Sequence, residues 1–98
     1  MRLVRALPLS KEAQILGRQL LRSGTSVGAN YRAACRARSR AEFVAKLGIV
    51  LEESDETAFW LELLNESNIF DHARLLPQID EANQLTAIFV SSICAAKR

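Results

Sequence analysis

The chain has 98 residues, of which 49% are apolar, 24% are charged and 6% are aromatic, and its net charge is +2. This length supports a single domain spanning residues 1–98, and the apolar content excludes an intrinsically disordered chain. The sequence lacks both an apolar stretch long enough to span a membrane and the apolar segment of a signal peptide. We therefore expect a cytoplasmic protein that has no membrane partner.

Metal-binding and nucleophilic residues are few. The chain has two cysteines, Cys35 and Cys94, and one histidine, His72. This set is too small for a structural zinc site, and neither cysteine has a candidate base beside it. Phosphate-binding loops, nucleophile elbows and paired-histidine motifs do not occur. The sequence therefore predicts no catalytic residue, metal, cofactor or small-molecule substrate, and it places both thiols, partly buried, on helix seams.

The first two elements are separated by a proline. Pro8 ends the short segment 1–7, because a proline disfavours helix in the residue before it. Ser10 then caps a long helix that we expect to run to about Ala37. Apolar residues recur along this helix at alternating spacings of four and three, which is the pattern of a heptad seam.

A second long helix is expected from Ser39 to the segment 65–68, since Ser39 and Glu42 fit the capping-box pattern. Its seam from Phe43 onward is the clearest periodicity in the chain. A turn is expected at 71–75, and Pro77 is placed in the first turn of a final helix. Three long antiparallel helices with short connections predict an all-α bundle.

The helix that begins at Ser39 carries more apolar residues than one seam can bury. Such surplus predicts a fourth helix, a partner subunit, or both. We expect a homo-oligomer whose interface contains Ile49, Glu52, Glu56, Phe59, Trp60 and Leu63.

Polar side chains interrupt the apolar seams of the two facing helices. We expect them to form a buried hydrogen-bonded network that fixes the register of the helices. A ligand site at the same residues is the alternative. The members are Ser23, Ser26, Asn30, Ser54 and Thr57.

The charges are segregated along the chain. Residues 1–46 contain ten lysines and arginines and two acids, whereas residues 47–98 contain three and nine. The arginines of the first long helix share one arc and continue around the corner into the next helix. Three interpretations remain open: a solvated face, docking on the acidic helix of a neighbouring copy, or a phosphate-binding surface. The residues are Arg18, Arg22, Arg32, Arg36, Arg38 and Arg40.

Two segments carry a family pattern. Residues 26–33 read SVGANYRA and residues 38–43 read RSRAEF. They resemble the signature S-I-x-x-N-I-A-E-G followed by S-x-x-E-F in proteins encoded in intervening sequences of bacterial 23S ribosomal RNA genes. Ala33 departs from the pattern, because the family commonly has glutamate there. The matching positions are Ser26, Asn30, Ser39, Glu42, Phe43, Leu47 and Glu56.

The resemblance implies an antiparallel up-down four-helix bundle, here with a shortened first helix, that assembles into homopentameric rings and has no enzymatic activity. Related bundles, the accessory proteins of diversity-generating retroelements, engage nucleic acid and a reverse transcriptase. By this analogy the leading hypothesis is a non-enzymatic oligomeric bundle that binds or scaffolds RNA or a nucleoprotein through its arginines. The alternative is a purely structural homo-oligomer whose basic and acidic helix faces pair between subunits, with no role for nucleic acid.

Overall fold

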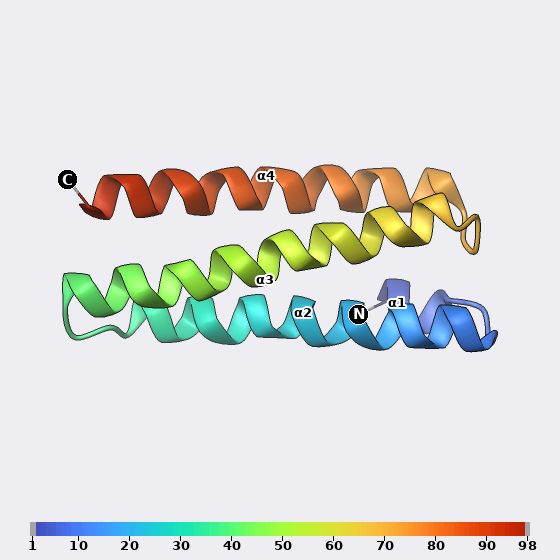
Figure 1. Cartoon of the computed structure of the whole chain (residues 1–98), viewed down its shortest axis with the longest axis horizontal. Helices are drawn as coiled ribbons and strands as arrows, with labels where there is room; N and C mark the ends of the chain where they lie inside the picture. Colours follow the sequence, from blue (N-terminus) through green and yellow to red (C-terminus); the bar gives the residue numbers. More distant parts are fainter. Residues whose placement is uncertain (1, 98) are drawn as a thin grey trace.

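A computed structural model describes residues 2–97, which form four helices and no strand. The helices are α1 (Arg2–Ala6), α2 (Lys11–Cys35), α3 (Arg40–Glu66) and α4 (His72–Lys97). The three long helices run antiparallel with short connections, and α1 lies against the first part of α2 (Figure 1). The predicted all-α bundle with a shortened first helix is confirmed.

Serine caps begin both α2 and α3, as the sequence predicts. The Ser10 hydroxyl accepts a hydrogen bond from the Ala13 amide at 3.2 Å, and the Ser39 hydroxyl accepts one from the Glu42 amide at 3.0 Å. The Glu42 carboxylate accepts a hydrogen bond from the Arg38 amide at 3.2 Å, one residue further back than a capping box requires. These bonds hold the α2–α3 connection against the start of α3.

The start of α4 differs from the prediction. The helix begins at His72, so that Pro77 is its sixth residue and the expected turn at 71–75 is helical instead. The Asp71 carboxylate accepts a hydrogen bond from the Ala73 amide at 2.9 Å, and Leu75 is fully buried. This cap and this burial stabilise a first turn that contains no proline, and they outweigh the hydrogen bond that Pro77 cannot donate.

Replacing Pro77 with alanine is expected to raise the free energy of unfolding by about 1–2 kcal/mol. The exposed position would gain an amide for the Ala73 carbonyl and lose a ring that crowds the preceding turn. Urea denaturation followed by circular dichroism measures the change. A lower stability in P77A would contradict a helix that already begins at His72.

The core lies along α3, which runs between α2 and α4 (Figure 1). Within residues 2–97, no Cα atom of α2 comes within 8 Å of one in α4. The long helices therefore contact each other mainly through α3. The largest fully buried apolar side chains come from all three: Leu20, Leu47, Val50, Leu64 and Leu75.

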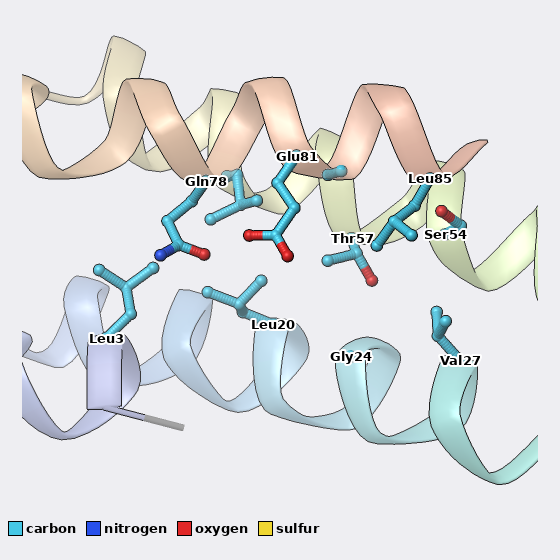
Figure 2. Close-up of a pocket in the computed structure, with 11 residues that line it drawn as sticks. Leu3, Leu20, Gly24, Val27, Ser54, Thr57, Gln78, Glu81 and Leu85 are labelled. Atoms are coloured by element: carbon cyan, nitrogen blue, oxygen red, sulfur yellow. The ribbon is translucent and has the colours of Figure 1, made fainter. Parts of the chain in front are cut away.

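The short helix α1 covers one end of the space between α2 and α4. Its residue Leu3 is buried, and the neighbouring Leu7 lies so close to Gly17 that a Cβ there would be 2.9 Å from the Leu7 Cδ1 atom. Beyond α1, helices α2 and α4 are separated by a groove with α3 at its base, and this groove contains a pocket of about 180 Å³ (Figure 2). Apolar side chains such as Leu20 and Leu85 project into this pocket (Figure 2).

The polar residues of the seams form separate groups rather than one network. Thr57 donates to Ser23 at 3.1 Å between α3 and α2, and Ser54 shares a 2.8 Å hydrogen bond with Thr86 of α4. Two of the predicted members are bonded within α2 alone, where the Asn30 amide donates to the Ser26 carbonyl and hydroxyl at 2.9 and 3.0 Å. The interhelical bonds involve Ser23 and Ser54, which are buried.

Both cysteines are exposed, so the expectation of partly buried thiols is wrong. On α2 the buried face includes Ala34, and the next residue, Cys35, is rotated about 100° from it.

The lengths and apolar content of the helices also bear on membrane insertion. None of the helices that the structure describes is long and apolar enough to cross a bilayer.

Candidate nucleic-acid interface

Arg22, in the middle of the predicted arginine surface, is engaged within the chain. Its guanidinium forms ion pairs with Glu53, at 3.5 Å, and with Glu56, both on α3. The indole N–H of Trp60 donates a hydrogen bond to the same Glu56 carboxylate at 3.2 Å. Arg22 therefore contributes little uncompensated positive charge to the surface of α2.

A second group of cations converges where α2 turns into α3. Arg32 comes from the last turn of α2, Arg36 and Arg38 from the connection that follows it, and Lys46 from α3. They line a hollow of about 510 Å³, which we call the basic cleft. The other residues that line the basic cleft are Ala29, Ala33 and Glu42.

The basic cleft has an excess of positive charge. Among residues 2–97, none of its four cations forms an ion pair. The single acid, Glu42, accepts a hydrogen bond from the backbone amide of Arg38. Arg32, Arg36 and Arg38 are exposed and Lys46 is half-buried, so the cations reach solvent from two helices and their connection.

The other predicted arginines lie outside the basic cleft. Arg18 lines a hollow beside α1 together with Leu7 and Gly17. It is 14 residues before Arg32, or about 21 Å along the axis of α2. Arg40 begins α3 without lining the basic cleft. The structure thus brings together three of the six predicted arginines.

Lys46 is the residue of the basic cleft that the sequence analysis missed. It follows Glu42 by four residues and therefore shares a face of α3 with it. That spacing predicts the face of α3 on which Lys46 lies. Whether Lys46 joins the cations of α2 depends on how α2 packs alongside α3.

The six residues predicted at an oligomer interface differ in their exposure and contacts. Ile49 and Phe59 are 40% and 53% exposed on α3, and Glu52 is also exposed. Trp60 and Leu63 are half-buried and pack against the core, with the Trp60 ring edge-on to Phe59 at 4.9 Å between centroids. The sixth residue, Glu56, is paired with Arg22.

A metal centre is not formed by the residues that the structure describes, because no group of three or more histidine, cysteine or acidic side chains converges among them. His72 instead lies at the connection between α3 and α4, where its ring nitrogens contact the side-chain oxygens of Asn65 and Asn68.

Antiparallel helices around a central α3, with a basic cleft at one connection, define a small helical-bundle protein with a cationic site. The chain belongs to the family of 23S rRNA-intervening sequence proteins, whose family model matches residues 1–91. It is also similar to a solved structure from Bacteroides thetaiotaomicron, a protein of unknown function from the S23 ribosomal protein family. The two chains are 39% identical, with a TM-score of 0.77, and the match covers 81% of this chain and 73% of the other. A search of curated proteins finds no match.

Proposed function

We propose that this protein is a non-enzymatic helical bundle that binds RNA through the phosphates, with the basic cleft as its principal contact. The observation that carries the proposal is the convergence of Arg32, Arg36, Arg38 and Lys46 without an ion pair among residues 2–97. Guanidinium groups suit phosphate because they donate two parallel hydrogen bonds to its oxygens. The similar structure from Bacteroides thetaiotaomicron is described as belonging to the S23 ribosomal protein family, and that description favours RNA as the phosphate-bearing partner.

Binding of this kind is expected to depend weakly on base sequence. Base stacking requires exposed aromatic rings, and no aromatic side chain among the described residues lines the basic cleft. The single tyrosine, Tyr31, is 47% exposed but lies outside the lining of the basic cleft, and its ring contacts Phe89 of α4 at 5.9 Å between centroids. Contacts to phosphate position a nucleic acid without reading its bases.

A salt titration tests the proposal. The affinity for a single-stranded RNA is expected to fall between about 50 and 200 mM salt, because bound cations are released from the RNA. The fall is about threefold if the basic cleft neutralises one phosphate and about fiftyfold if it neutralises four. Fluorescence anisotropy with a labelled oligonucleotide measures the affinity at each salt concentration. No measurable affinity for RNA, or an affinity that does not change with salt concentration, would contradict RNA binding by the basic cleft.

A homo-oligomer is the second candidate function, and the exposed apolar side chains on α3 favour it. Ile49 and Phe59 are 40% and 53% exposed although both are large and apolar. An assembly, expected to be a ring of five, would cover them. Pairing of basic and acidic helix faces between subunits is less favoured, because Arg22 already pairs with Glu53 and Glu56 of its own chain.

Replacing Phe59 with aspartate tests the oligomer. The exposed side chain is dispensable for the core, so the variant should remain folded while its mass in solution falls from that of an assembly to that of one chain. Light scattering on both proteins measures the masses. A wild-type chain that is already monomeric would contradict this second candidate function.

A further inference from the structure

We infer that the basic cleft is a pocket for a terminal phosphate, the phosphomonoester at the end of an RNA strand. This inference rests on the proposed function and names the part of the RNA that the basic cleft recognises. Three features support it: the distribution of cations along α2, the charge inside the basic cleft, and the side chains that form its walls.

Cations on α2 do not form a continuous track for a nucleic-acid backbone. Arg18 lies about 21 Å from Arg32 along the helix axis. Between them Arg22 is paired with two carboxylates of α3, Glu53 and Glu56. A backbone laid along α2 would therefore meet acids in the middle and uncompensated cations only near the ends. The cations Arg32, Arg36, Arg38 and Lys46 instead surround one hollow, which suits one highly charged group better than a row of phosphates.

The charge of the basic cleft fits a phosphomonoester. Counting the described residues 2–97, four cations and one carboxylate line it, which leaves an excess of three positive charges. A phosphodiester carries one negative charge and two unbridged oxygens, whereas a terminal phosphate carries about −1.5 to −2 and has three. The third oxygen and the added charge give further cations a hydrogen-bond partner. Convergent donors such as Arg36, Arg38 and Lys46 therefore gain an additional acceptor oxygen and a stronger attraction from a terminal phosphate than from a diester.

The walls of the basic cleft are held in place and leave room between them. Arg32 projects from α2, and Arg36 caps that helix with its backbone amide bonded to the Ala33 and Ala34 carbonyls. Lys46 projects from α3, whose start is fixed by the Ser39 cap. Two alanines, Ala29 and Ala33, contribute only methyl groups to the lining. A longer side chain at position 33 would enter the hollow, and a carboxylate there would compete with phosphate for the same cations.

The experiment compares one RNA oligonucleotide in three forms: hydroxyl groups at both ends, a 5′ phosphate, or a 3′ phosphate. At least one phosphorylated form is expected to bind about tenfold more tightly than the hydroxyl form. Inorganic phosphate at millimolar concentration should reduce this preference to near one. Fluorescence anisotropy at fixed salt measures all four conditions.

Three variants locate the effect. Ala33→Glu introduces a carboxylate into the basic cleft at a helix position that glutamate tolerates, and it should remove the preference for a phosphorylated end. Gln84→Glu makes the same change of charge on an exposed part of α4 and should keep the preference. Lys46→Ala, which adds no acid, should reduce the preference severalfold. Circular dichroism confirms that each variant is folded.

The outcomes separate the terminal-phosphate pocket from the proposed function. Equal affinity of the wild-type protein for all three RNA forms would overturn the pocket and leave general RNA binding in place. A loss of preference in Q84E as large as in A33E would also overturn the pocket, because the effect would then be one of net charge. Failure of every RNA form to bind would overturn both. A preference that A33E removes and Q84E keeps supports both.

Discussion

Replacing Leu75 with alanine is expected to lower the free energy of unfolding by about 2–5 kcal/mol. Leu75 is 0% exposed and lies in the same core cluster as Leu20 and Leu64. Its truncation removes buried methyl groups and leaves a cavity that the surrounding helices fill only in part. For a domain of this size such a loss is a large fraction of the total stability. Urea denaturation measures it through the transition midpoint.

Leu76→Ala is the matched control. Leu76 is the next residue of the same helix turn and is 51% exposed. Its truncation should cost less than about 1 kcal/mol, because little apolar surface is returned to water. The contrast also tests the packing of the first turn of α4, in which Leu75 is buried in the core and Leu76 is exposed. Equal losses for the two variants would show that this turn is not packed as described.

The double charge reversal Arg32→Glu and Arg36→Glu is expected to lower RNA affinity at least about a hundredfold at about 100 mM salt. Two attractive contacts would become repulsive ones in a cleft where only Arg38 and Lys46 would remain cationic. Both arginines are exposed, and within residues 2–97 neither forms an ion pair, so the fold should be unaffected. Anisotropy with labelled RNA measures the affinity, and circular dichroism measures the helix content.

The control for this double variant is Lys11→Glu with Arg18→Glu. It makes the same change of net charge at the opposite end of α2. Its affinity should fall less than about tenfold, through long-range repulsion alone. An equal loss in both double variants would mean that RNA responds to the total charge of the chain and that the basic cleft has no special role.

The boundaries of α2 and α3 could be predicted because their signals are local. Ser10 and Ser39 cap the helices by bonds to residues three positions later. The start of α4 could not be predicted in the same way. Pro77 is a local signal for the first turn of a helix, but the burial of Leu75 is a tertiary property and decides the outcome. Local rules therefore failed where packing against another helix compensated for the missing hydrogen bond.

The candidate site also combines features that the sequence predicts with features that depend on how the helices pack. The arginines of α2 could be placed on one face from helical periodicity alone. Two facts about that face depend on α3: Arg22 is compensated by Glu53 and Glu56, and Lys46 joins the basic cleft from across the connection. Both facts require knowing which faces of α2 and α3 meet. A single sequence predicts the faces of each helix but not their contacts.

The measurement that tests RNA binding at the basic cleft most directly is a nuclear magnetic resonance titration of the labelled protein with a short 5′-phosphorylated RNA. The largest amide shifts are expected at positions that line the basic cleft, from Ala29 on α2 to Lys46 on α3. Amides around Phe59 on α3 and Leu85 beside the groove should change little. Shifts concentrated at either of those two regions, with the basic cleft unchanged, would contradict the account.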